Sequence, residues 1–253
     1  MDIVVCMKLV PDLKQVRIKA GTREPVLDGV PQVWGDMDKN ALEAALQLRE
    51  RHGGKVTVVT VGLGKLKEAM VEALAVGADE GVMVTDPAFH ELDSAGAARA
   101  LAAAISRIGR WDLVLAAEGS TDNYSGQVGP RVAELLGLPQ VTFVRELKVE
   151  GSRLQAVRSM EDAFEVVQCS LPALVTVTQE INTPRLPPLT AILRASRKPQ
   201  QTWSAAELGL AASPVVQRLR NLAPEQQRKN VIFEGEDAVA KLVAALTREG
   251  VLG

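Results

Sequence analysis

VTVVTVGLGKLKEAMVEALAVGADEGVMVTD, residues 56–86, is the stretch that decides the fold. It opens and closes with two nearly continuous apolar runs, Val56–Val61 and Gly81–Thr85. Such runs are typical of strands buried on both faces of a parallel sheet. Between them, Leu66 to Val76 has apolar residues at helical spacing. A strand, a helix and a strand with short connections predict one right-handed crossover unit.

The same pattern extends outward on both sides of this unit. Two further apolar runs, Ile3–Met7 and Leu113–Ala117, are predicted to be strands. Residues 38–51 and 94–108 have the spacing of amphipathic helices. We therefore predict an α/β fold with a doubly wound, mostly parallel sheet.

Two regions depart from this alternation. Residues 15–27 place apolar residues around a turn at Ala20-Gly21-Thr22, which predicts a small hairpin. After Val141 come four short strand-like segments, which predict an antiparallel extension of the sheet. These segments are Thr142–Leu147, Arg153–Val157, Phe164–Cys169 and Ala173–Thr178.

From Asn182 onward, prolines and cations replace the core pattern. A final amphipathic helix is predicted from Glu236 to Arg248. A tail of this length with little core of its own normally lies on another surface. We therefore expect two parts: residues 1–181 as a nucleotide-binding α/β domain, and residues 182–253 as a partner-recognition loop and C-terminal arm that wraps a partner subunit.

Composition excludes several classes of function. Of 253 residues, 47% are hydrophobic and 3% aromatic, so Val, Leu, Ile and Ala must build the core. A formal charge of −2 gives no basis for binding nucleic acid. Cys6 and Cys169 provide neither a disulfide framework nor a metal motif. Since no signal peptide and no run of roughly 20 apolar residues is present, we expect a soluble, cytoplasmic protein without membrane insertion.

The stretch AEGSTDNYSGQVGPRVAELLG, residues 117–137, follows a predicted strand and opens a predicted helix. Its small and polar residues allow backbone N–H groups to approach an anion at a helix N-terminus. Open α/β sheets bind ligands at the carboxyl ends of their strands. The loop is therefore a candidate phosphate site, although an ordinary capped loop has the same composition.

Two other strand ends are candidates for the same site. In VWGDMDKNALE, residues 33–43, Gly35 provides a turn, and Asp36 or Asp38 could cap the following helix. The second is Val61-Gly62-Leu63-Gly64, which precedes the helix at Leu66. Alone, each pattern is weak, because helix caps are common.

Taken together, the motifs resemble the beta (small) subunit family of electron-transfer flavoproteins along nearly the whole chain. The matching stretches are IVVCMKLVPD (3–12), DGVPQVWGDMDKNALEAALQL (28–48), VTVVTVGLGK (56–65), EALAVGADEGVMVTD (72–86), TDNYSGQVGPRVAELLGLPQVTFV (121–144) and LPALVTVTQEINTPRLPPLTAILRASRK (171–198).

This resemblance implies a fold of the adenine-nucleotide-binding type and an electron carrier rather than an enzyme. It implies a heterodimer with an alpha subunit that holds FAD, and electron transfer from flavin dehydrogenases to an electron acceptor oxidoreductase. The beta pocket would hold AMP in a structural role. The alternative is an electron-bifurcating member with a second FAD that reacts with NADH. A free-standing adenine-nucleotide sensor or hydrolase is disfavoured, since no catalytic constellation is evident.

The resemblance also implies nucleotide contacts, with no catalytic and no metal residues. They fall on Cys6, Gly35, Asp36, Met37, Asp38, Val61, Ala117, Gly119, Ser120, Thr121, Asp122, Asn123, Tyr124, Ser125, Gly126, Gln127 and Val128. Tyr124 is bulky, and we expect it to narrow the pocket, which favours AMP over a dinucleotide.

The proline-rich segment resembles the recognition loop of this family. Leu189 stands where the family has an anchoring leucine that enters a partner dehydrogenase, and Arg194, Arg197 and Lys198 follow it. An apolar anchor among cations suits a docking surface. A solvated basic loop is the plainer interpretation of the same residues.

Overall fold

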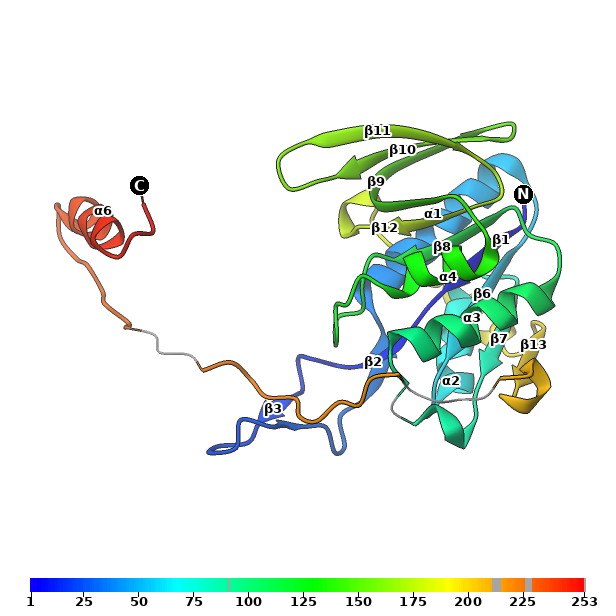
Figure 1. Cartoon of the computed structure of the whole chain (residues 1–253), viewed down its shortest axis with the longest axis horizontal. Coiled ribbons are helices and arrows are strands. Elements are labelled where there is room, and N and C mark those ends of the chain that lie inside the picture. The colour runs from blue at the N-terminus through cyan, green and yellow to red at the C-terminus, as the bar shows by residue number, and fades with distance from the viewer. Residues whose placement is uncertain (91, 211–214, 226–228, 253) are drawn as a thin grey trace.

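The computed structural model describes residues 1–90, 92–210, 215–225 and 229–252. Within these residues the main sheet has nine strands in the order β11-β10-β9-β12-β8-β1-β6-β7-β13 (Figure 1). The strands are β1 (Ile3–Cys6), β6 (Val56–Val61), β7 (Glu80–Val84), β8 (Leu113–Ala117), β9 (Gln140–Glu150), β10 (Arg153–Ser159), β11 (Phe164–Ser170), β12 (Ala173–Val177) and β13 (Gln200–Trp203).

Helices cover both faces of the sheet, which confirms the doubly wound α/β prediction. Apolar side chains of α1 and α2 share one buried cluster, and those of α3 and α4 share the other. The helices are α1 (Asp36–His52), α2 (Leu66–Val76), α3 (Ser94–Ile108), α4 (Val128–Leu136), α5 (Leu189–Ala195) and α6 (Ala238–Arg248), with short 3-10 turns at Pro87–Phe89, Gln179–Ile181 and Ala206–Leu208.

Alternation along β1 shows why the sequence forms this layer structure. Ile3 and Val5 belong to the cluster under α1, whereas Val4 and Cys6 belong to the cluster under α3. Successive side chains of a strand point to opposite faces, so a strand between two helical layers must be apolar at every position. The strand β1 therefore lies at the centre of the molecule.

The antiparallel extension is confirmed for three strands and is wrong for the fourth. β10 pairs antiparallel with both β9 and β11. β12, however, lies between β8 and β9 and is parallel to both. Its five residues are all buried, which is the pattern of an interior parallel strand rather than of an exposed hairpin.

Two small ribbons lie outside the main sheet. β3 (Arg17–Ile18) and β4 (Pro25–Val26) pair antiparallel, which confirms the hairpin predicted in residues 15–27. The second ribbon pairs β2 (Leu9–Pro11) with β5 (Gln32–Trp34). It brings the chain from the end of β1 to the start of α1.

The order of the strands fixes where a ligand can bind. From β1 the chain moves outward through β6 and β7, and then returns to place β8 on the other side of β1. β1 and β8 are parallel neighbours, and the segments that leave them diverge. This is the topological switch point, where open α/β sheets have a crevice at the carboxyl ends of the strands.

The tail beyond residue 181 is not uniform. β13 pairs parallel with β7, so the sheet continues past the predicted boundary. α6 instead stands away from the sheet (Figure 1), and none of its residues is buried among those that the structure describes. Residues 211–214, 226–228 and 253 of the predicted arm lie outside the described residues. The division into domain 1–181 and arm 182–253 stays a prediction.

Candidate functional site

A cavity of about 740 Å³ lies at the switch point. Its wall is formed by the segments that leave β1, β6 and β8, together with the first turns of α3 and α4. This volume is within the range of roughly 300–1,000 Å³ that holds small-molecule ligands and cofactors. The fold therefore provides a ligand cavity at the place where the topology requires one.

The loop between β8 and α4 forms one side of this cavity. The N–H of Tyr124 donates to the carbonyl of Ser120 at 2.8 Å, which closes a tight turn. Gly126 has a φ of +64°, a conformation that glycine adopts readily. α4 then begins at Val128, and the side chain of its N-cap residue Gln127 makes no capping hydrogen bond within the described structure. The first N–H groups of α4 are thus available to an anion.

Lys8 joins the end of β1 to this loop. Its Nζ lies 2.7 Å and 2.8 Å from the two carboxylate oxygens of Asp122 and 3.3 Å from Ser120 Oγ. Burial alone would raise the pKa of Asp122, but the hydrogen bonds from Lys8 and Ser120 outweigh burial and lower it. Asp122 therefore stays ionised, and the ion pair fixes the loop against β1.

Asp38 is the most unusual side chain in the wall. It is only 4% exposed, and its Oδ1 accepts the backbone N–H of Lys8 at 3.3 Å. Oδ2 is also buried and has no hydrogen-bond partner among the described residues. Burial raises the pKa of Asp38 to about 8. A buried polar oxygen without a partner is costly, and burial favours the neutral carboxyl of Asp38 over the charged form.

Gly35 and Cys6 define the surroundings of Asp38. A Cβ atom at Gly35 would collide with Asp38 Oδ2, so glycine makes room for the carboxylate. The helix α1 begins at Asp36, and neither Asp36 nor Asp38 caps it through its side chain, contrary to the expected cap. Burial and then the charge of Asp38 raise the pKa of Cys6 to about 12, so Cys6 is a neutral thiol and a poor nucleophile.

The structure gathers most of the predicted nucleotide contacts into this cavity. Those in its wall are Cys6, Asp38, Val61, Ala117, Gly119, Ser120, Asp122, Asn123, Ser125, Gly126, Gln127 and Val128. Gly35, Asp36 and Thr121 instead line a separate pocket of about 200 Å³. Met37 and Tyr124 are in the wall of neither pocket.

Tyr124 does not narrow the cavity, so that expectation is wrong. Its ring is exposed, and its hydroxyl donates to the carboxylate of Glu118. This hydrogen bond, with some burial, raises the pKa of Tyr124 to about 12. The ring also packs beside Gly119, where a Cβ would meet it at 3.1 Å. Tyr124 therefore braces the loop from outside.

Sequence reasoning missed several wall residues. Lys8 follows the first strand directly, so its position at a strand end was the available signal. Gln32 and His90 also line the cavity, as do Val216 and Arg218. Arg218 Nη2 lies 3.4 Å from Asn123 Oδ1, although the two residues are 95 positions apart. No local pattern in the sequence predicts this contact between the tail and the loop that joins β8 to α4.

The predicted partner residues lie on a different surface. We call residues 186–197 the docking segment. It includes α5 and displays Leu186, Leu189 and Leu193 at 89%, 75% and 74% exposure. Arg194 and Arg197 are exposed beside them. Lys198 is different, because its Nζ donates to the carbonyls of Leu74 and Ala78 at 2.9 Å and 2.5 Å.

No group of three or more His, Cys, Asp or Glu side chains could hold a metal ion in the described ranges. No helix in the described part of the chain is long and apolar enough to cross a membrane.

Comparisons with known proteins agree with this architecture. The family model described as "Electron transfer flavoprotein domain" matches residues 28–208. The electron transfer flavoprotein subunit beta of Thermoanaerobacterium thermosaccharolyticum is 38% identical over all of both chains. That of Clostridium acetobutylicum is 38% identical over 98% of this chain and 99% of its own. The caffeyl-CoA reductase-Etf complex subunit CarD of Acetobacterium woodii is 34% identical over the whole length of both. The chain therefore belongs to the family of electron transfer flavoprotein beta subunits.

Proposed function

We propose that this chain is the beta subunit of a heterodimeric electron-transfer flavoprotein whose switch-point cavity holds an adenine nucleotide. The observation that carries the proposal is the cavity itself, where the loop 118–127 leads into the uncapped start of α4. A phosphate group suits this position because backbone N–H groups and the helix dipole both favour an anion. The alpha subunit would hold the FAD that carries electrons onward.

The identity of the nucleotide depends on size. The bulk of Tyr124 would favour AMP if it narrowed the cavity, but Tyr124 lies outside the cavity wall. The cavity of about 740 Å³ lies in the upper half of the range of roughly 300–1,000 Å³ for ligand sites. FAD contains the whole of AMP together with a flavin mononucleotide half. We therefore favour FAD in this cavity and keep AMP as the competing ligand.

The residues present fit such a ligand. Loop 118–127 and α4 would hold phosphate, and the side chain of Asp38 lies in the wall of the same cavity. Apolar residues such as Leu63, Phe89 and Leu101 offer surface for a ring system. FAD bound here would supply two-electron exchange with NADH, as in the bifurcating alternative. The chain's own part is to bind, orient and shield the ligand.

Nucleotide analysis of the purified heterodimer tests this proposal. The complex is denatured, and the FAD and AMP released are quantified against protein. A second equivalent of FAD, with no AMP, is the expected result. One equivalent of FAD with stoichiometric AMP would leave the site in place and overturn the choice of FAD. Release of FAD from the alpha subunit alone, with neither nucleotide from this chain, would overturn the site.

The exposed docking segment supports a second part of the proposal. Leu189 and its apolar neighbours are available to a flavin dehydrogenase, and Arg194 and Arg197 would steer a partner with an acidic rim. Lys198 does not belong to this cationic group, since its ammonium is bound to carbonyl oxygens at the end of α2.

A further inference from the structure

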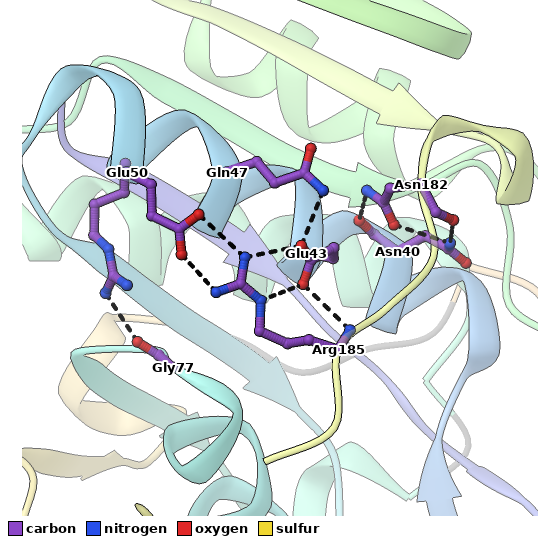
Figure 2. Close-up of polar contacts among 8 residues, drawn as sticks. Asn40, Glu43, Gln47, Glu50, Gly77, Asn182 and Arg185 are labelled. Atoms are coloured by element: carbon purple, nitrogen blue, oxygen red, sulfur yellow. Dashed lines mark hydrogen bonds and ion pairs between the residues drawn. The ribbon is translucent and has the colours of Figure 1, made fainter. Parts of the chain in front are cut away.

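The docking segment is tied to α1 by Arg185, the residue immediately before it. The guanidinium of Arg185 reaches two carboxylates that lie two turns apart on α1, Glu43 and Glu50 (Figure 2). Nε and Nη2 lie 2.7 Å and 2.9 Å from the two oxygens of Glu43, and Nη1 lies 2.5 Å from Glu50 Oε1. The planar fork of arginine suits such paired contacts in a way that lysine cannot match.

Burial makes the inner half of this contact consequential. The side chain of Glu43 is only 5% exposed and also accepts a hydrogen bond from Gln47 at 2.9 Å. Burial alone would raise its pKa, but the hydrogen bonds from Arg185 and Gln47 outweigh burial and lower it. An unpaired buried carboxylate is costly. The conformation of the chain in which Arg185 pairs with Glu43 is therefore strongly favoured.

A pair of asparagines extends the tie toward β12. Asn40 Nδ2 donates to the carbonyl of Asn182 at 2.8 Å, and Asn182 Nδ2 donates to the carbonyl of Asn40 at 3.0 Å (Figure 2). Asn40 is one turn before Glu43 on α1. Residues 182–185 are therefore held along one face of this helix by side chains on both partners.

The other end of the docking segment is fixed on α2. Ala195 is fully buried, and the next anchor, Lys198, binds two carbonyl oxygens at the end of α2. Between the two ties, Leu186, Leu189 and Leu193 remain exposed. The segment thus spans α1 and α2 as a bridge with its apolar side chains outward.

We propose that Arg185 is a positioning residue for docking, which sets the conformation in which Leu189 meets the dehydrogenase. This inference rests on the proposed docking function of the segment. A segment that is already ordered loses less conformational entropy when a partner binds. Loss of the contact with Glu43 and Glu50 releases the residues just before Leu189, so the cost of ordering them moves to the docking step.

The test uses the full heterodimer and its native dehydrogenase, with flavoprotein concentration set by FAD content. Arg185→Gln, Leu189→Ala and the double variant are compared in steady-state assays. Arg185→Gln should raise KM for the flavoprotein by about fivefold at unchanged kcat, the effect of one or two side chains left to order on docking. In the Leu189→Ala background, Arg185→Gln should add little, because coupled residues are not additive. Arg185→Lys should restore part of the loss.

Arg153→Gln, at an exposed position of β10, makes the same charge change elsewhere and should leave KM unaltered. If Arg185→Gln does not fold, Glu43→Gln combined with Arg185→Gln removes the uncompensated charge and takes its place. A raised KM for Leu189→Ala with a normal KM for the Arg185 variants would overturn positioning and keep the docking function. Additive effects, or a loss of flavin and kcat at constant KM, would also overturn positioning. A normal KM for Leu189→Ala would overturn the docking function itself.

Discussion

Asp38 is an ionisable side chain whose burial disfavours its charged form. It lies in the first turn of α1 with one carboxylate oxygen bonded to the chain and the other buried without a partner in the described structure. Burial is the main cause of the raised pKa of Asp38. The N–H and the charge of Lys8 lower this pKa without cancelling the effect of burial, and the charge of Asp122 raises it further. The fold therefore keeps a costly carboxylate in the wall of its cavity, which is typical of binding sites.

Asp38→Asn should stabilise the nucleotide-free chain increasingly as pH rises. The folded pKa of about 8 lies above the unfolded value of 3.8 because burial disfavours the charged form. The stability contributed by the protonated carboxyl is thus fully present below pH 3.8 and is lost as pH rises through 8. Asparagine keeps an acceptor for the N–H of Lys8 and cannot ionise.

Thermal unfolding from pH 5 to pH 9 measures this effect as a growing Tm advantage of Asp38→Asn over the wild type. Asp36→Asn is the control, since Asp36 is exposed on the same turn. Parallel pH profiles for the wild type and Asp38→Asn would show that the carboxylate is not destabilising.

In the loop that joins β8 to α4, Gly126 has a backbone conformation that most other residues adopt only at a cost. A Cβ atom there would meet only the carbonyl of Glu118, at 3.8 Å, so crowding is not the obstacle. The φ of +64° is the obstacle, because a β-branched residue is poorly tolerated there. The left-handed conformation costs roughly 1–2 kcal/mol for ordinary residues.

Gly126→Val should therefore lower nucleotide retention by about tenfold, the change that roughly 1.4 kcal/mol produces. Gly126→Asn should remain close to the wild type, because asparagine tolerates this conformation. The measurement is nucleotide content per folded heterodimer during dialysis. Equal losses in both variants would point to the side chain's bulk, and equal retention would remove this loop from the site.

The candidate site could be predicted only in part from the sequence. Loop 118–128 was predictable because its composition and its place after a buried strand both indicate anion binding. The direction of each side chain in the loop was not predictable. Tyr124 turns outward to Glu118, while Thr121 faces the smaller pocket. Arg218 was also out of reach, since its contact with Asn123 spans the chain.

At the scale of elements, α5 and the residues that follow it carry three cations with different roles. Arg194 and Arg197 are exposed, whereas Lys198 caps the carbonyl end of α2 and has a pKa lowered mainly by burial. The sequence shows three nearby cations and does not separate these roles, because the difference comes from packing of α5 on α2.

A pair of variants separates steering from structure. Arg197→Gln should reduce the association rate with the dehydrogenase at low salt, and the difference should vanish near roughly 0.5 M salt, where screening is strong. Lys198→Met leaves two buried carbonyls without their donor, at a cost of about 1–3 kcal/mol each. It should lower Tm while the salt dependence of association is unchanged. Stopped-flow kinetics and thermal unfolding measure the two effects, and a salt-dependent loss in Lys198→Met would return it to the steering group.

β12 illustrates which elements the sequence leaves undecided. Its segment was expected to be the last strand of an antiparallel extension, yet it lies between β8 and β9. The strand itself was predictable from a nearly continuous apolar run, but its neighbours depend on non-local pairing. Gly129 of α4 would collide with Thr176 of β12 if it carried a Cβ, so this placement is specified by close packing that local patterns do not reveal.

At the scale of the whole molecule, α6 is a helix with no buried residue in the described structure. The sheet and its helices bury two continuous clusters, whereas α6 exposes Val239, Leu242 and Val243 at helical spacing. A lone amphipathic helix of this length is only marginally stable in water. Membership of the beta-subunit family implies an alpha subunit, and α6 has the form of an element that completes its burial on that partner.

Leu242→Ser should therefore weaken the heterodimer and leave the beta chain folded. Burying a leucine side chain contributes roughly 1.5–3 kcal/mol, which is about one to two decades in Kd for the alpha subunit. Lys241→Ser is the matched control: it introduces serine at the adjacent position, and loses only an exposed ion pair with Asp237.

Titration of labelled alpha subunit gives Kd, and circular dichroism of the beta chain reports its fold. Because α6 adds nothing to the two buried clusters, Tm of the isolated beta chain should be equal in both variants. Equal Kd values for the two variants would place the alpha subunit elsewhere, and a lower Tm for Leu242→Ser alone would mean that α6 packs on its own chain.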